Sequence, residues 1–260
     1  MEKVDVSSKR IYSLNLKYHY NSLKVLRALQ TNEEVEIIDT NETFITFINP
    51  MYPQRLMRLA KPPTCLFYEG DITLIHKPSI GIIGSRENSE YGYNVIKELI
   101  KHIPKDYIII SGMAKGIDGL AHKEAIKYGL RTIGVIGSGL KYIYPKINAD
   151  LFREVKGNHL LVSEYRYEEP IRQNHFVERN RLIAALSDIL IVIESTLRSG
   201  TSITVKEMLD LGKEVYVIPH TIFSETGKGN LKMIEDGANL LWDLDEFSKM
   251  LKNDLTNTKK

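Results

Sequence analysis

Residues 80–86 read Ile-Gly-Ile-Ile-Gly-Ser-Arg, a short run of branched apolar residues that ends in a glycine followed by two polar residues. A short apolar run closed by a turn signal is typical of a strand that is buried on both faces. Similar runs recur along the chain. The candidate strands are Ile80–Ile83, Tyr107–Ser111, Thr132–Ile136, Leu160–Ser163, Ile189–Glu194 and Val215–Pro219.

Helical patterns fill the intervals between these strands, because apolar residues recur there near the i, i+3 and i+4 positions. The candidate helices are Asn94–His102, Leu120–Tyr128, Phe176–Leu186 and Ser202–Leu211. The alternation of strand and helix indicates successive βαβ units on a parallel sheet. We therefore predict an α/β fold, a Rossmann-like, doubly wound and mostly parallel sheet of about six strands with helices on both faces.

The segments that flank this pattern have a different character. Residues 1–50 predict a small N-terminal helical subdomain, with a helical pattern over Ser22–Leu29. We expect the core domain to span residues 51–242 and to begin with a connector that contains several prolines. Residues 243–260 predict a short amphipathic stretch, Leu244–Leu251, that ends in a frayed polar tail.

Composition limits the class of protein. With 260 residues and 43% hydrophobic composition, the chain is long enough to bury a sizeable core. The single cysteine, Cys65, excludes an intrachain disulfide and a cysteine zinc cluster, and it fits a reducing compartment. The net charge of +2 does not by itself predict a nucleic-acid partner. Neither a signal peptide nor an apolar run of about 20 residues is present, so we expect a cytoplasmic protein with no membrane partner.

Small and polar residues follow four of the predicted strands. In an open parallel sheet the ligand lies beyond the carboxyl ends of the strands, where backbone amides and helix N-termini favour anions. One glycine turn alone is equally explained by backbone geometry, but four at one edge favour an anion site. The segments are Gly84-Ser85-Arg86, Ser111–Gly116, Gly137-Ser138-Gly139 and Glu194–Thr201.

Neither standard nucleotide fingerprint is present. Leu140 stands where a Walker A loop needs its lysine, and Tyr142 stands where the dinucleotide motif needs its third glycine. Asp118 and His122 share a helix face, but they have no third ligand nearby, so we interpret Asp118 as a helix N-cap rather than as part of a metal site. We expect no metal, no cofactor and no catalytic residue.

Basic residues gather near the same predicted edge. Arg86 follows the first strand, and Arg179, Asn180 and Arg181 open a helix. Arginine binds phosphate oxygens in a bidentate manner, so we expect Arg86 to meet Arg179 and Arg181 across the edge. The alternative is a solvated helix face whose charge neighbouring glutamates neutralise.

Together these segments resemble the DNA-processing protein A family, also called DprA or Smf, over roughly residues 52–238. The matching motifs include Tyr52-Pro53-Gln54-Arg55-Leu56, Ile83-Gly84-Ser85-Arg86, Ser111-Gly112-Met113-Ala114-Lys115-Gly116-Ile117-Asp118, Gly137-Ser138-Gly139-Leu140, Ser163-Glu164-Tyr165, Phe176 with Arg179-Asn180-Arg181, and Ser199-Gly200-Thr201. The resemblance implies a homodimeric, non-enzymatic protein that binds single-stranded DNA and shields it from nucleases. It also implies that the protein helps to load the RecA recombinase in natural transformation and DNA recombination.

The resemblance also implies a set of DNA-binding residues in this chain. They are Gly84, Ser85, Arg86, Gly137, Ser138, Gly139, Lys141, Lys146, Phe176, Arg179, Asn180, Arg181, Ser199, Gly200 and Thr201. The sequence departs from the family pattern at His220, where glycine is usual, and at both termini. Residues 1–50 are no obvious helix-hairpin-helix or SAM-like domain, and no winged-helix-like segment follows the core.

Two alternatives use the same predicted fold. One is a nucleoside monophosphate phosphoribohydrolase of the lysine-decarboxylase-like family, whose motif places a catalytic glutamate where this chain has Thr204. The other is a sensor that binds a small nucleotide in the same pocket. The missing glutamate counts against the enzyme, whereas the sensor stays open.

Overall fold

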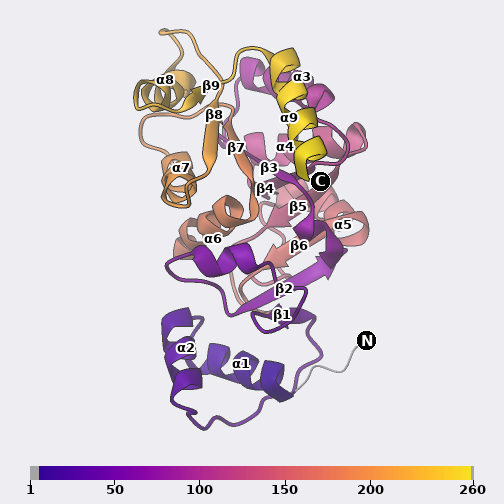
Figure 1. Ribbon diagram of the computed structural model, residues 1–260, viewed down its shortest axis with the longest axis vertical. Helices are drawn as coiled ribbons and strands as arrows, with labels where there is room; N and C mark the ends of the chain where they lie inside the picture. Colours follow the sequence, from indigo (N-terminus) through magenta and orange to yellow (C-terminus); the bar gives the residue numbers. More distant parts are fainter. Residues whose placement is uncertain (1–5, 259–260) are drawn as a thin grey trace.

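The computed structural model describes residues 6–258 of the chain. These residues form one sheet with helices on both faces (Figure 1). The strands are β1 (Phe44–Thr46), β2 (Cys65–Gly70), β3 (Ser79–Ile83), β4 (Ile108–Gly112), β5 (Arg131–Val135), β6 (Leu160–Ser163), β7 (Ile189–Val192), β8 (Glu214–Val217) and β9 (Asn239–Leu240). The α-helices are α1 (Val6–Lys17), α2 (Ser22–Gln30), α3 (Glu90–His102), α4 (Ile117–Lys127), α5 (Ala149–Asn158), α6 (Gln173–Leu186), α7 (Thr201–Asp210), α8 (Lys228–Glu235) and α9 (Leu244–Thr258).

The sheet has the order β1-β2-β6-β5-β4-β3-β7-β8-β9. Every pairing between β6 and β9 in this order is parallel, which confirms the predicted doubly wound α/β fold. The six predicted strands are β3 to β8, each within two residues of its predicted ends. Three strands were not predicted from the sequence. They are β1 and β2, which extend the sheet beyond β6 in antiparallel orientation, and the two-residue strand β9.

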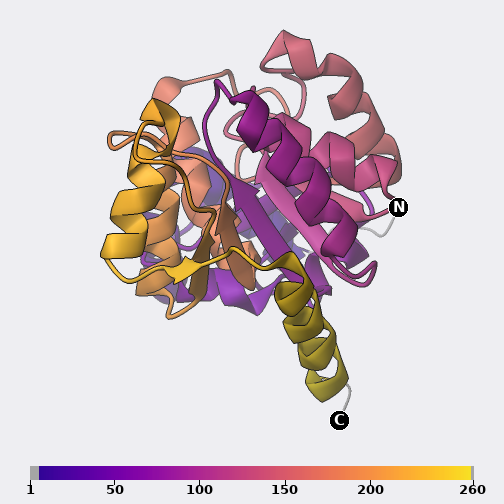
Figure 2. The same ribbon diagram turned by 90° about the horizontal axis from the view of Figure 1, so that it is seen from above.

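Two apolar layers enclose the central strands. Residues Ile83, Ile110 and Val192 face α6 and α7, and they belong to the cluster that contains Leu182 and Met208. The opposite side chains of the same strands pack against α3, α4 and α9. Figure 2 shows these two groups of helices on either side of the sheet. Both faces of β3 are therefore buried, as the run at residues 80–83 predicts.

Helices at both ends of the chain pack on this body. Helix α1, which the sequence analysis missed, buries Ile11 and Tyr12 against Phe44 of β1. Helix α9 runs to Thr258, so the tail is not frayed after Leu251 as expected. The reason is that Leu255 lies four residues after Leu251 and packs against the same apolar cluster beneath α3.

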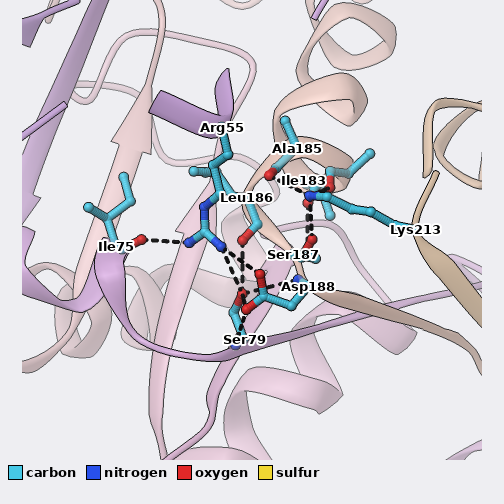
Figure 3. Close-up of polar contacts among 10 residues, drawn as sticks. Arg55, Ile75, Ser79, Ile183, Ala185, Leu186, Ser187, Asp188 and Lys213 are labelled. Carbon is cyan, nitrogen blue, oxygen red and sulfur yellow. Dashed lines mark hydrogen bonds and ion pairs between the residues drawn. The ribbon is translucent and has the colours of Figure 1, made fainter. Parts of the chain in front are cut away.

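Charged side chains at the amino ends of the strands make two neighbouring sets of polar contacts (Figure 3). Arg55 donates to the Asp188 carboxylate at 3.0 Å, and that carboxylate accepts from the Ser79 amide at 2.8 Å. Lys213 donates to the Ala184, Ala185 and Ser187 carbonyls at the C-terminal end of α6, over 3.0, 2.7 and 2.6 Å. We call these residues (Arg55, Ser79, Asp188 and Lys213) the amino-edge network.

Candidate nucleic-acid interface

The order in which the strands are added to the sheet reverses between β3 and β7, which lie side by side and run parallel. From β3 the strands proceed through β4 and β5 to β6 on one side, whereas from β7 they proceed through β8 to β9 on the other. The loops that leave β3 and β7 at their carboxyl ends therefore diverge. Such a switch point opens a crevice, which is the usual ligand position in this kind of fold.

A polar cavity of about 430 Å³ occupies this switch point. It lies at the N-terminus of α7, where no side chain caps the first backbone amides. The Ser202 and Ile203 amides donate to the Ser199 and Gly200 carbonyls at 3.3 Å, so it is mainly the helix dipole that favours an anion there. The lining residues are Ile83, Gly84, Ser85, Arg86, Ala114, Asp118, Arg179, Asn180, Ile183, Thr196, Ser199, Gly200, Thr201 and Thr204.

A second cavity of about 260 Å³ adjoins the first and has a more apolar wall. Tyr144 and Phe176 stand together in it, with ring centroids 5.5 Å apart. Aromatic rings beside cationic groups provide surfaces on which unpaired bases stack. The lining residues are Arg86, Glu87, Met113, Ala114, Lys115, Ile136, Gly137, Ser138, Tyr144, Pro145, Phe176 and Arg179.

Arg179 belongs to the walls of both cavities, together with Arg86 and Ala114. Its side chain is buried, with only 5% of the residue exposed, and it donates through Nη1 to the Val135 carbonyl. Nε has no hydrogen-bond partner among residues 6–258. Burial lowers the pKa of Arg179, which the nearby Asp118 carboxylate partly offsets. A buried guanidinium with an unused donor between two cavities is suited to an anionic ligand.

Asp118 is not the helix N-cap that the sequence analysis expected. Helix α4 begins at Ile117 after Gly116, so Asp118 is its second residue and points into the interior. Burial raises the pKa of Asp118, and Arg179 lowers it. A Cβ atom at Gly112 would collide with both the Arg179 guanidinium and the Asp118 carboxylate, so glycine is required where these two groups approach β4.

His122 has a structural role, as the sequence analysis favoured. Its Nε2 lies 2.8 Å from the Gly112 carbonyl oxygen, and its Nδ1 lies 2.5 Å from the Thr132 hydroxyl. Burial lowers the pKa of His122 to about 4, so the ring is neutral at pH 7. Within the described part of the chain, no group of three His, Cys, Asp or Glu residues is placed to hold a metal ion.

Most of the predicted DNA-binding residues meet at the two cavities. Those that line one or both are Gly84, Ser85, Arg86, Gly137, Ser138, Phe176, Arg179, Asn180, Ser199, Gly200 and Thr201. Gly139, Lys141, Lys146 and Arg181 line neither. Lys141 pairs with Glu168 at 2.8 Å, Gly139 packs against the backbone of Arg166 and Tyr167, and Lys146 is exposed beyond Pro145.

The expected meeting of Arg86 with Arg181 does not occur. Arg181 pairs with the buried Glu164 at 2.5 Å and lines neither cavity, whereas Arg179 lines both cavities together with Arg86. On a helix, residues two positions apart point about 200° apart, so Arg179 and Arg181 cannot face the same cavity. The pair formed by Arg181 and Glu164 is the internal neutralisation that the alternative interpretation of this segment proposed.

The structure adds lining residues that the predicted set lacks. Tyr144, Asp118, Thr196 and Thr204 each line a cavity. Tyr144 precedes Pro145 in the long loop after β5, and no local pattern indicates that it faces Phe176. Thr196 and Thr204 could have been predicted from the sequence. Thr196 lies three residues before the predicted 199–201 segment, and Thr204 lies three residues after it.

The loop that carries Arg86 is held in place by Glu194 at the end of β7. The buried Glu194 carboxylate accepts from the Ser89 amide at 2.8 Å and from its hydroxyl at 2.7 Å. The Glu194 carbonyl accepts from the Ser85 amide at 2.9 Å. Arg86 itself has no hydrogen-bond or ion-pair partner among the described residues, so a fixed loop presents a free guanidinium.

A model of the family described as DNA recombination-mediator protein A matches residues 43–252 of the chain. The chain belongs to this family. The DNA processing protein DprA of Bacillus subtilis is 38% identical to it over 209 residues, which cover 80% of this chain and 70% of that protein. DprA of Streptococcus pneumoniae is 37% identical over 196 residues, which cover 75% of this chain and 70% of that protein.

Solved DprA structures share the fold. The X-ray structure of DprA from Streptococcus pneumoniae has a TM-score of 0.82 at 30% identity, and the match covers 93% of this chain and 95% of that one. DprA from Helicobacter pylori has a TM-score of 0.74 at 28% identity, covering 84% and 99%. The Helicobacter pylori protein is described as having a unique single-stranded DNA binding mode. The family resemblance predicted from the sequence is thus confirmed.

The described residues contain no helix that is both long and apolar enough to span a bilayer.

Proposed function

We propose that this protein binds single-stranded DNA along the carboxyl edge of its sheet. The observation that carries the proposal is Arg179, a buried guanidinium that lines both a polar and an aromatic cavity and has one donor, Nε, without a partner in the fold. The Helicobacter pylori relative binds single-stranded DNA, which supports the same ligand here.

In this proposal the polar cavity binds phosphate and the aromatic cavity binds a base. Arg86, Arg179 and the N-terminus of α7 bind phosphate oxygens, since arginine and helix amides both donate to anions. Tyr144 and Phe176 stack with a base, which is worth about 1–3 kcal/mol and tolerates any sequence. Binding through phosphates and stacking therefore requires no particular base sequence.

In this role the protein is a cytoplasmic, homodimeric binder rather than an enzyme. It shields incoming DNA from nucleases and helps to load the RecA recombinase during natural transformation. Membership of the recombination-mediator family supports this part of the proposal. In the phosphoribohydrolase alternative, a catalytic glutamate would stand at position 204, but a buried threonine lines the cavity there. We expect incubation with AMP to release no free base.

Fluorescence anisotropy with labelled oligo-dT tests the proposal. We expect Arg86→Ala to weaken binding by about tenfold or more, because a charge-assisted hydrogen bond is worth about 1.5–3 kcal/mol. Arg131→Ala is the matched control, since Arg131 is an exposed arginine at the amino end of β5, paired with Asp71. Equal binding by wild type and Arg86→Ala at low salt would mean that DNA does not occupy these cavities.

A further inference from the structure

Two large apolar side chains stand in solvent beyond the polar cavity. Ile222 and Phe223 are consecutive in the loop between β8 and α8, and 73% and 87% of their surfaces are exposed. Because β8 runs parallel to β7, this loop leaves the sheet at the carboxyl edge, which also carries the two cavities. Single exposed apolar residues are common on protein surfaces, but an adjacent pair at a ligand-binding edge is informative.

The base of this loop is fixed by contacts with the rest of the molecule. His220 contacts the Ile193 carbonyl through Nε2 at 2.9 Å, and its ring packs edge-on against Tyr91 at 4.9 Å. The Tyr91 hydroxyl donates to the Pro219 carbonyl at 2.9 Å, and Thr226 lies 3.5 Å from Glu194. The exposure of Phe223 therefore belongs to an anchored loop, held partly by His220.

The helix that follows this loop, α8, begins beside the wall of the polar cavity. The Gly229 amide donates to the Ser195 carbonyl at 2.7 Å, and Gly229 packs so closely on Thr196 that a Cβ atom would collide with the Thr196 carbonyl. Thr196 lines the polar cavity, and Arg198 follows two residues later. Arg198 is exposed and has no hydrogen-bond or ion-pair partner within residues 6–258.

We propose that Arg198 and Phe223 form a second section of the DNA path, in which Arg198 binds a phosphate and Phe223 stacks with an unpaired base. This inference rests on the proposed single-stranded DNA binding and extends it beyond the two cavities. The occupant is the continuation of the same strand, because Arg198 and Phe223 lie on loops that leave the neighbouring strands β7 and β8 at the carboxyl edge, where the polar cavity also lies, and they offer a free cation and an exposed ring. Those are the two components of a sequence-tolerant single-strand site.

A series of oligo-dT lengths separates this section from the cavities. We would measure anisotropy with oligonucleotides of about 4 and about 20 nucleotides, which span the range of single-strand site sizes. Phe223→Ala should weaken the long oligonucleotide at least about fivefold and leave the short one unchanged, because the short one fills only the cavities. Phe223→Trp should restore the affinity for the long oligonucleotide. Arg198→Ala should also weaken only the long one, and its affinity should depend less steeply on salt concentration than that of wild type, because one phosphate contact is lost.

Two variants on α7 serve as matched controls. Leu209→Ala removes an exposed apolar side chain near the far end of the helix, and Lys206→Ala removes an exposed cation. Neither should change the affinity for either oligonucleotide. Arg86→Ala should weaken both lengths, so a failure of the cavity site is distinguishable from a failure of this second section.

Three results would overturn the inference. In the first, Phe223→Ala leaves the affinity for the long oligonucleotide unchanged while Arg86→Ala reduces it. In the second, Phe223→Ala weakens both lengths equally, which would place Phe223 inside the primary site. In the third, Phe223→Ala changes the molecular mass of the protein in light scattering but not its affinity for oligo-dT. Phe223 would then contact another protein chain rather than DNA.

Discussion

The cationic side chains at the two edges of the sheet differ in whether they have partners. At the amino edge, Arg55 meets Asp188 and Lys213 meets three carbonyls, and neither cation has an unpartnered buried atom. At the carboxyl edge, Arg179 has an Nε without a partner and Arg86 has no partner at all. Cations at the amino edge thus contact the fold itself, whereas the two arginines at the carboxyl edge are the ones that we propose bind a ligand.

This contrast gives a criterion for separating structural from functional cations. A buried donor without a partner has a free-energy cost that the fold does not recover. Where a helix N-terminus, two cavities and a free arginine accompany that donor, a phosphate recovers the cost. Arg181, only two residues from Arg179, also has two buried donors without a hydrogen-bond partner, Nε and Nη1. It belongs to the structural class because it pairs with Glu164 and lines neither cavity, so an unpartnered donor alone does not mark a ligand site.

The largest expected effect is at the amino edge. Lys213→Met removes the donor that three carbonyls at the end of α6 share, and we expect it to destabilise the protein by about 3 kcal/mol. Urea unfolding measures the loss. Oligo-dT affinity should be unchanged under folding conditions, whereas a large loss of affinity would break the division between the two edges.

The next effect concerns His122, which lies below the carboxyl edge but has both ring nitrogens partnered. Because its pKa is about 4 in the folded protein and near 6.5 unfolded, the unfolded chain binds more protons between these values. Stability should therefore fall as the pH falls through that window, by about 2 kcal/mol between pH 7 and pH 5.

The matched variant for this pH dependence is His122→Gln, which does not titrate. Its free energy of unfolding should change less between pH 7 and pH 5 than that of wild type, whatever its stability at pH 7. Equal slopes for the two proteins in urea unfolding would show that another group causes the loss.

A smaller effect sharpens the assignment of Arg86 at the carboxyl edge. The logarithm of oligo-dT affinity should fall linearly with the logarithm of salt concentration, and Arg86→Ala should reduce that slope by about 0.7, the value for one phosphate contact on a single strand. Arg86→Ala should change the free energy of unfolding by less than about 0.5 kcal/mol, because the side chain has no partner to lose. An unchanged slope would argue against a direct phosphate contact.

The smallest effect is expected at Asp118. Its carboxylate stands near Arg179 and partly offsets the charge offered to a ligand. Asp118→Asn should tighten oligo-dT binding about two- to threefold at low salt and lose this gain at high salt. A weaker affinity would mean that Asp118 positions Arg179 rather than competing with the ligand for it.

Sequence patterns predicted the parallel strands well, since each is a short apolar run between helical segments. They missed β1 and β9, which have three and two residues, because such short strands carry no periodic signal. They missed α1 because polar Ser8, Ser13 and Asn15 lie among its buried residues, which obscures the helical spacing.

Within the site, the residues that follow the strand ends were predictable because the chain direction alone places them at one edge. The ion pair between Lys141 and Glu168 could not be predicted, because these residues are far apart in sequence and meet only in the folded protein. Helix geometry predicts that Arg179 and Arg181, two residues apart, point in different directions. Their spacing should therefore have excluded one of them from the predicted DNA-binding set.

Arg179, one side chain in the wall between two chambers, has a consequence for how binding energies combine. A base that enters the aromatic cavity and a phosphate that enters the polar one must both accommodate the same guanidinium. Groups that share a partner have coupled free energies, so losses from substitutions in the two chambers do not simply add. If DNA binds as proposed, substitutions at Phe176 and at Asn180, which line different cavities, should therefore lose an amount of binding free energy that differs from the sum of the two single losses.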